Sequence, residues 1–217
     1  MTIIGTMATD PPVVAGGRRL RRPAGAARQA SYDDEVRTLI TAAQTVMARC
    51  GRTSSPRVAD ILAEAGLSNQ AFYRHFRGRD DLIVATYEQG LLDIYHYLRL
   101  RVSRQRGLTA RLSAWITGLL AQIDDPELAE MSSAILWNVN QIARGDSEIA
   151  PVGHRRILGL LTEILRDGGV DQPDRTARFI QTLVLAMMST YLESGESPSD
   201  SERDHLLRFC LAGSRHP

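Results

Sequence analysis

The stretch from Ser54 to Leu82 constrains the fold of this chain more than any other. It reads SSPRVADILAEAGLSNQAFYRHFRGRDDL and predicts two short helices joined by a tight turn. Ser55 is a suitable N-cap residue for the first helix. Pro56 is tolerated at the first helical position, because the first N–H of a helix has no partner and proline lacks this group. Gly66 can adopt the left-handed conformation that ends this helix, and Ser68 then caps a second helix over residues 69–76. This is the helix-turn-helix pattern, in which the second helix presents its N-terminal side chains to the major groove of DNA.

Helical spacing of apolar residues continues on both sides of this pattern. Before it, apolar residues between Val36 and Cys50 recur at intervals of three and four, which predicts a helix that starts at Ser31 and ends at Gly51. This helix is expected to pack on the two short helices as a three-helix unit. After the pattern, the same periodicity predicts six helices and no strand, over residues 79–101, 109–123, 126–143, 151–166, 173–193 and 200–211. The sequence therefore predicts an all-α fold of nine helices in two unequal groups.

Charge is distributed unevenly along the chain, although the formal net charge is only +1. Residues 1–80 carry twelve arginines and seven acidic residues, whereas residues 81–217 carry fourteen arginines and eighteen acidic residues. A basic first part and an acidic remainder indicate that binding of a polyanion is confined to the first part. Every basic residue other than histidine is arginine, a bias that is typical of GC-rich coding and indicates an actinobacterial source.

Residues 1–30 mix proline, glycine, alanine and arginine without periodicity, which predicts a disordered, arginine-rich arm. Two interpretations are open for this arm. It is either a solvated tail or a segment that follows DNA phosphates or enters the minor groove.

Several motifs from Ala42 to Leu82 resemble the DNA-binding domain of the TetR family. The resemblance needs no insertion or deletion and includes a distinctive Tyr-x-His-Phe ending; the motifs are Ala42-Ala43, Gly51, Val58-Ala59-Asp60-Ile61, Ala65-Gly66-Leu67-Ser68, Phe72-Tyr73-Arg74-His75-Phe76 and Arg79-Asp80-Asp81-Leu82. The resemblance implies a dimeric, all-α transcription regulator. It also implies a helix-turn-helix DNA-binding domain at residues 31–78, and a larger domain at 79–217 that binds an effector and dimerises through its last two helices.

The second helix of the pattern carries the side chains that we expect to read DNA. Asn69 and Gln70 are amides in its first turn, and bidentate contacts from such amides favour adenine. The remaining candidates are expected to contact the phosphate backbone, or a thymine methyl group in the case of the tyrosine: Thr53, Arg57, Ser68, Tyr73, Arg74, His75 and Arg79. For Tyr73 and His75 a structural role, through ring packing and a hydrogen bond, is the alternative.

Tryptophan, methionine and tyrosine are concentrated in three later helices, where we expect an effector pocket. Small-molecule sites are usually apolar with a few polar groups, and few ionisable residues interrupt these helices, which favours an apolar effector. The candidate lining residues are Trp115, Leu119, Met131, Trp137, Asn138, Gln141, Phe179, Leu183, Met187 and Tyr191. Asn138 and Gln141 are neighbours on one helical turn and are expected to orient the ligand. The alternative is that these side chains simply fill the core.

The last two predicted helices are the candidates for dimerisation. The helix over 173–193 is apolar on more than one side, and with the helix over 200–211 it could form a four-helix bundle with a twofold mate. We therefore predict a ligand-responsive repressor that binds a palindromic DNA operator as a homodimer. The alternative is a DNA-binding regulator or activator that has no small-molecule effector.

Other classes of protein find little support in the sequence. No Ser/Cys–His–acid grouping, HExxH spacing or glycine-rich phosphate loop indicates an enzyme or a cofactor. The two cysteines lack metal-ligand spacing, so we expect no metal site. No apolar run is long enough to span a bilayer, and we expect a cytoplasmic protein with no membrane partner. A helical interaction protein or a DNA-bending factor remains the second alternative.

Overall fold

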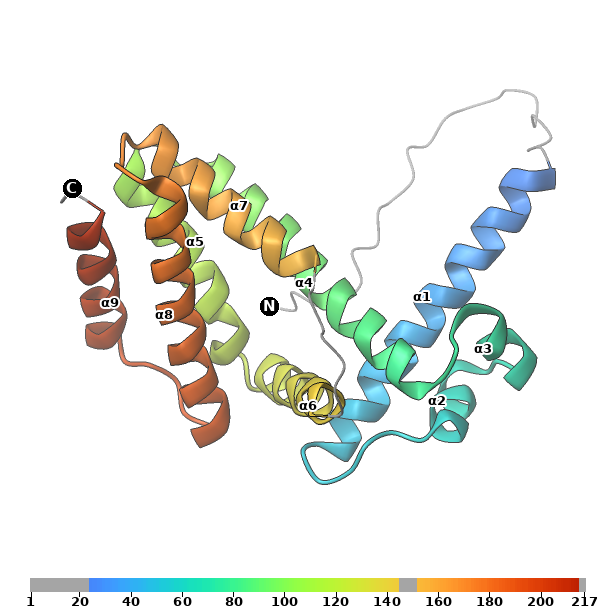
Figure 1. Cartoon of the computed structure of the whole chain (residues 1–217). Coiled ribbons are helices and arrows are strands. Elements are labelled where there is room, and N and C mark those ends of the chain that lie inside the picture. Colours follow the sequence, from blue (N-terminus) through green and yellow to red (C-terminus); the bar gives the residue numbers. More distant parts are fainter. Residues whose placement is uncertain (1–23, 145–151, 215–217) are drawn as a thin grey trace, which may run out of the picture.

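The protein is described here by a computed structural model that covers residues 24–144 and 152–214, with the side chains of residues 32–144 and 152–214. Within these ranges the chain forms nine helices and no strand, which confirms the all-α prediction. The helices are α1 (Ala24–Cys50), α2 (Val58–Ala65), α3 (Asn69–His75), α4 (Arg79–Ser103), α5 (Leu108–Asp124), α6 (Pro126–Ala143), α7 (Val152–Asp167), α8 (Pro173–Ser194) and α9 (Asp200–Gly213). Figure 1 shows α1–α3 at one end of the molecule, α8 and α9 at the other, and α4 between them.

Two predicted helix starts are wrong. The first helix begins at Ala24 and not at Ser31, so that residues 24–30 of the predicted disordered arm are helical. These residues include several strong helix formers, which allow the helix to extend towards the N-terminus. The rest of the predicted arm lies outside the described residues. The helix α2 begins at Val58, with Arg57 in the N-cap position, and Ser55 therefore does not cap it.

The later helices begin and end within two residues of their predicted positions. The start of α6 shows why such boundaries can be predicted. The carboxylate of Asp125 accepts hydrogen bonds from the backbone N–H groups of Glu127 and Leu128, at 3.0 and 3.2 Å, and Pro126 occupies the first helical position. An acidic cap followed by proline is a local signal that needs no tertiary contact.

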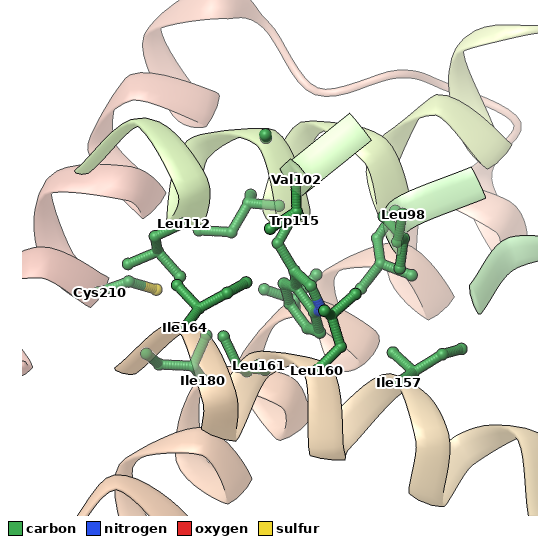
Figure 2. Packing of buried hydrophobic residues seen from close by; sticks show 14 of the residues in the cluster. Leu98, Val102, Leu112, Trp115, Ile157, Leu160, Leu161, Ile164, Ile180 and Cys210 are labelled. Carbon is green, nitrogen blue, oxygen red and sulfur yellow. The ribbon is translucent and has the colours of Figure 1, made fainter. Parts of the chain in front are cut away.

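Buried apolar side chains form two cores. The first, which we call the N-terminal core, combines α1–α3 with the start of α4 and with α6: Leu39, Ile40, Ala42, Ala43, Val46, Met47, Ile61, Leu62, Phe72, Phe76, Leu82, Ile83, Ala134, Ile135 and Val139. The contribution of α6 was not predicted. The second, the C-terminal core, is built by α4, α5 and α7–α9, and Figure 2 shows Trp115 within it among side chains such as Leu98, Val102 and Leu161.

The helix α4 belongs to both cores. Its first turns contribute Leu82 and Ile83 to the N-terminal core, whereas Leu91, Leu98 and Val102 belong to the C-terminal core. Tyr87, between them, packs against both cores. One continuous helix therefore joins the helix-turn-helix to the remainder of the molecule, as Figure 1 shows.

Hydrogen bonds join the middle of α4 to the first turn of α7. The two carboxylate oxygens of Glu88 accept from the backbone N–H groups of Val152 and Gly153, at 2.6 and 3.1 Å. A carboxylate in this position also interacts favourably with the helix dipole. The Tyr87 hydroxyl and His154 Nε2 share a further hydrogen bond of 2.6 Å. Burial raises the pKa of Tyr87 to about 12, so the phenol is neutral and can donate this bond.

Candidate nucleic-acid interface

The short helix α3 is held against the N-terminal core by one of its faces. It has only seven residues and would not be stable in isolation. Gly66, with a φ of 65°, ends α2 in the left-handed conformation, and the Ser68 hydroxyl accepts a hydrogen bond of 3.2 Å from the Ala71 N–H at the start of α3. Both caps were predicted and are confirmed. Phe72 and Phe76 are buried and fix the inner face of the helix.

The opposite face of α3 is polar and exposed. Asn69, Gln70, Tyr73 and Arg74 all lie on it, together with the capping Ser68. The Tyr73 side chain is a large aromatic group, and it is 62% exposed even though the neighbouring Phe72 is fully buried. The structure therefore brings five of the nine predicted DNA-contacting residues together on one surface.

The predicted phosphate contact of His75 is wrong. Its side chain is fully buried, and its Nε2 atom lies 2.6 Å from Glu35 Oε2 on α1. The ring of Tyr32 packs edge-on against it, with 4.2 Å between the ring centroids. The hydrogen bond from His75, and to a smaller extent the charge of Arg74, lowers the pKa of the Glu35 carboxyl. His75 thus has the alternative, structural role and joins α3 to α1.

Three arginines lie beside a hollow where the start of α2 meets the start of α4. The hollow has a volume of about 830 Å³, and its lining includes Arg57, Arg77 and Arg79 together with Asp80 and Asp81. The sequence analysis missed Arg77, although it lies between two predicted contacts. The Arg79 guanidinium is 2.8 Å from the Asp80 carboxylate and remains partly exposed. Arg57 directly precedes α2, and Arg77 and Arg79 lie at the junction between α3 and α4.

Thr53 lies before α2 and is exposed. Its hydroxyl donates a hydrogen bond of 2.8 Å to the backbone carbonyl of Cys50. One lone pair of the hydroxyl oxygen stays accessible, but the proton is already used within the loop. Thr53 is therefore a weaker candidate for a phosphate contact than the arginines.

The predicted effector residues do not line one common pocket. Trp115 and Leu119 are buried in the C-terminal core, and Met187 and Tyr191 pack against its edge. Met131 instead packs against the N-terminal core, and Trp137 is half-buried on α6.

The structure does not place Asn138 and Gln141 together as one pair of ligand-orienting groups. Asn138 is buried, and its Nδ2 donates to the Ala134 carbonyl one turn earlier in α6, at 2.9 Å. Gln141 is exposed and accepts a hydrogen bond of 3.2 Å from Arg144. Residues three apart lie on neighbouring faces of a helix, and here the edge of the buried surface passes between the two.

Phe179 and Leu183 are also not interior residues. They lie on the outer face of α8, where Phe179 is 64% exposed and Leu183 is 37% exposed. The guanidinium of Arg175 lies 5.7 Å from the centroid of the Phe179 ring. On α9 the Phe209 side chain is 62% exposed. Large apolar side chains on the surface of both terminal helices are typical of an interaction surface.

Two polar side chains of α5 are buried without satisfied hydrogen bonds. Among the described residues, Trp115 Nε1 has no partner, and neither has the Oε1 or the Nε2 atom of Gln122. The two residues are seven apart and therefore lie on the same face of the helix. Gln122 was missed in the sequence analysis, although it is the single amide in an otherwise apolar stretch.

Comparison with known proteins bears directly on the exposed face of α3. Residues 53–86 match the family model described as bacterial regulatory proteins, tetR family. The family model thus covers the helix-turn-helix segment and not the remainder of the chain. The match spans α2, α3 and the first turns of α4, and so contains the exposed face of α3 and the three arginines beside the hollow. No curated protein matches the sequence of the chain.

Solved structures of several bacterial regulators share the fold of most of this chain. The reduced form of NemR from E. coli has a TM-score of 0.64 at 17% identity, with 84% of this chain and 99% of that chain covered. FadR from Bacillus subtilis in complex with stearoyl-CoA has a TM-score of 0.58 at 17% identity, over 81% of this chain and 97% of that one. NalD from Pseudomonas aeruginosa, the secondary repressor of the MexAB-OprM multidrug efflux pump, has a TM-score of 0.57 at 13% identity, over 86% and 100% of the two chains. At these identities the likeness establishes the fold alone.

Two further features are absent from the part of the chain that the structure describes. It contains no group of three or more His, Cys, Asp or Glu side chains that could hold a metal ion. None of the helices in residues 24–144 and 152–214 is both long and apolar enough to cross a membrane.

Proposed function

We propose that this chain is a sequence-specific transcriptional regulator that binds a near-palindromic DNA operator as a homodimer. The observation that carries the proposal is the division of α3 into a buried face and an exposed polar face. A recognition helix must be held rigidly by the domain and must present side chains that reach base edges. Phe72 and His75 hold α3 against the domain, and Asn69 and Gln70 are exposed and free to reach base edges.

The charges around α3 support a phosphate-binding role. Arg57, Arg77 and Arg79 line a hollow between the start of α2 and the start of α4, and Arg74 lies on the exposed face of α3. Contacts between arginine and phosphate fix the register of a protein on DNA, whereas contacts with base edges give specificity. In this proposal Asn69 and Gln70 read bases, and the arginines with Tyr73 hold the backbone.

The exposed apolar residues of α8 and α9 support the dimer. Phe179, Leu183 and Phe209 would be covered by a second copy that packs its α8 and α9 against them. The same arrangement would give two recognition helices related by a twofold axis. Such a pair reads two half-sites of a palindrome.

A small-molecule effector is part of the proposal, and the C-terminal core beside α5 is its best-supported place. Unsatisfied polar groups cost about 1–3 kcal/mol each when buried, and Trp115 and Gln122 together present three of them. A largely apolar ligand with one or two hydrogen-bonding groups would satisfy them. The structure of FadR in complex with stearoyl-CoA supports this part of the proposal, because it is a regulator of the same fold with a bound ligand.

Selection of binding sites from a random duplex library tests the function directly. The wild-type protein is expected to enrich a near-palindromic sequence, and Asn69→Ala and Gln70→Ala are expected to relax the base preference at one position of each half-site. Asn140→Ala removes an equally exposed amide from α6, away from α3, and is the matched control. Enrichment of no sequence, or an unchanged preference in both α3 variants, would contradict the proposal.

A further inference from the structure

A second hollow lies between the C-terminal end of α4 and the first half of α5. Its volume is about 530 Å³, and its lining includes Arg101 and Arg104 from the end of α4, and Ser113 and Thr117 from α5. Arg101 is 22 residues further along α4 than Arg79, a distance of roughly 33 Å in an α-helix. The hollow is therefore remote from the surface that α3 presents and is not part of it.

The sequence around this hollow is unusually basic. Between Asp93 and Asp124 the chain contains five arginines and no acidic residue. The positive charge of one of the five, Arg111, is compensated by a carboxylate on another helix, because its guanidinium lies 2.8 Å from Asp167 on α7. Within the described residues, Arg101 and Arg104 have no such carboxylate partner. Two positive charges consequently face the hollow without compensation, in the otherwise acidic part of the chain.

The guanidinium of Arg101 is held in a fixed orientation by neutral groups. Its two terminal nitrogens donate hydrogen bonds of 3.1 Å to the Tyr97 hydroxyl and to the Thr117 hydroxyl. The Tyr97 ring also lies beneath it, with 6.0 Å between the guanidinium carbon and the ring centroid. These contacts use two of the five N–H donors of an arginine and leave its charge intact. An arginine that is oriented in advance loses less entropy when it binds an anion.

Gly118 allows this arrangement. A Cβ atom at this position would lie 2.5 Å from Leu98 Cδ2 and 3.3 Å from Arg101 Cδ. The absence of a side chain therefore lets α4 and α5 approach closely enough for the aliphatic part of the Arg101 side chain to pack against α5. The guanidinium can then reach Thr117, one residue before the glycine.

We propose that this hollow binds a small phosphate monoester. Such a group carries close to two negative charges at pH 7, which matches the two uncompensated guanidinium groups of Arg101 and Arg104. Gln105 and Ser113 add neutral donors from the lining. Leu100, which is 48% exposed, and Tyr97 provide an apolar wall for the organic part of the ligand. A hollow of about 530 Å³ is large enough for a small organic phosphate. The site requires only the described residues and does not depend on the proposed binding of DNA.

Isothermal titration calorimetry of the full chain with phenyl phosphate tests this site. We expect binding to the wild-type protein, and affinity that is roughly tenfold to a hundredfold lower in Arg101→Gln and in Arg104→Gln, because each variant loses charge-assisted hydrogen bonds. Arg101→Lys, which keeps the charge but loses the planar fork, should bind with intermediate affinity. Thermal unfolding should show that the variants fold, because both arginines are exposed.

Arg99→Gln is the matched control. It removes the same charge from the same helix at a residue outside the lining, and it should change the affinity less than threefold. Phenol and benzoate complete the series and should bind at least tenfold more weakly than phenyl phosphate. Equal losses in Arg99→Gln and Arg101→Gln would overturn the site, because they would indicate attraction by the net charge alone. Equal affinity for benzoate would overturn the assignment of the ligand as a phosphate, and absence of phenyl phosphate binding would overturn both.

Discussion

Phe72 and Tyr73 are neighbours on α3 and should respond very differently to replacement by alanine. Phe72 is fully buried in the N-terminal core, whereas Tyr73 is 62% exposed. Removal of a buried phenylalanine side chain costs about 3–5 kcal/mol, from lost burial and from the cavity left behind. This is a large part of the roughly 5–15 kcal/mol by which a typical domain is stable. Replacement of the exposed tyrosine should cost less than about 0.5 kcal/mol in the free energy of unfolding.

Urea unfolding followed by circular dichroism measures this difference. With an m value of about 2 kcal/mol per molar urea, Phe72→Ala should lower the midpoint by roughly 2 M and Tyr73→Ala by less than about 0.3 M. All variants must be compared at one protein concentration, because a dimer becomes more stable as its concentration rises.

The same two variants should both weaken DNA binding, for different reasons. Phe72→Ala releases α3 from the core, whereas Tyr73→Ala leaves α3 in place and removes only an exposed side chain, which the proposed function places against DNA. Tyr73→Phe is the conservative control, since it removes the hydroxyl and keeps the ring. Similar midpoints for Phe72→Ala and Tyr73→Ala would refute the assignment of buried and exposed faces. A stable Tyr73→Ala variant with wild-type affinity for a selected operator would refute the role of that face in DNA binding.

Three further variants test other parts of the structure. Gly153→Ala would bring a Cβ atom to 2.4 Å from Leu91 Cβ, so thermal unfolding should show that the free energy of unfolding falls by about 1–3 kcal/mol. Gly159→Ala is the control in the same helix, because its Cβ meets no atom within 4 Å and should not destabilise the protein. Tyr87→Phe should cost about 0.5–1.5 kcal/mol in urea unfolding, through the lost hydrogen bond to α7. The pKa of Tyr87 is about 12 in the folded protein and about 10 in the unfolded one; the wild-type protein should therefore lose stability as the pH rises from about 10 to 12, and the phenylalanine variant should lose less. Arg74→Ala should flatten the salt dependence of DNA affinity by about one unit, and an altered base preference with an unchanged salt dependence would contradict its role as a phosphate contact.

Local signals in the sequence were sufficient for most of the fold. Glycine, proline and capping residues end or start a helix through backbone chemistry that acts within one turn, and the bounds of α6 and the turn at Gly66 follow from it. The start of α1 was missed because helix propensity, which is a weaker signal than a cap, extends that helix to Ala24.

The burial of His75 could have been predicted from the sequence. His75 is three residues after Phe72 and one before Phe76, and this spacing places all three on one face of a helix. We predicted a phosphate contact for His75 from its residue type, because histidine is polar. The helical period is the better guide here, and Glu35 on α1 supplies the partner that a buried imidazole needs.

The outer face of α8 shows a limit of periodicity. An apolar stripe such as Phe179 and Leu183 looks the same in the sequence whether it faces the interior of the chain or a second molecule. The position of Gln122 illustrates the same limit for polar residues. An amide within an apolar stretch can be recognised, but whether it is buried without a partner depends on how the other helices pack around it.

The two cores restrict how a ligand could act on DNA binding. Ala134 and Ile135 of α6 are packed into the same core as Leu39 of α1 and Phe72 of α3. Close-packed side chains resist sliding, so α6 cannot move far without moving the helix-turn-helix with it. The C-terminal core meets this unit through Tyr87 of α4, which packs against both cores. A ligand that repositions α4 or α6 would therefore shift α3 as part of a rigid body, and the spacing of two recognition helices in a dimer is the quantity that such a shift changes.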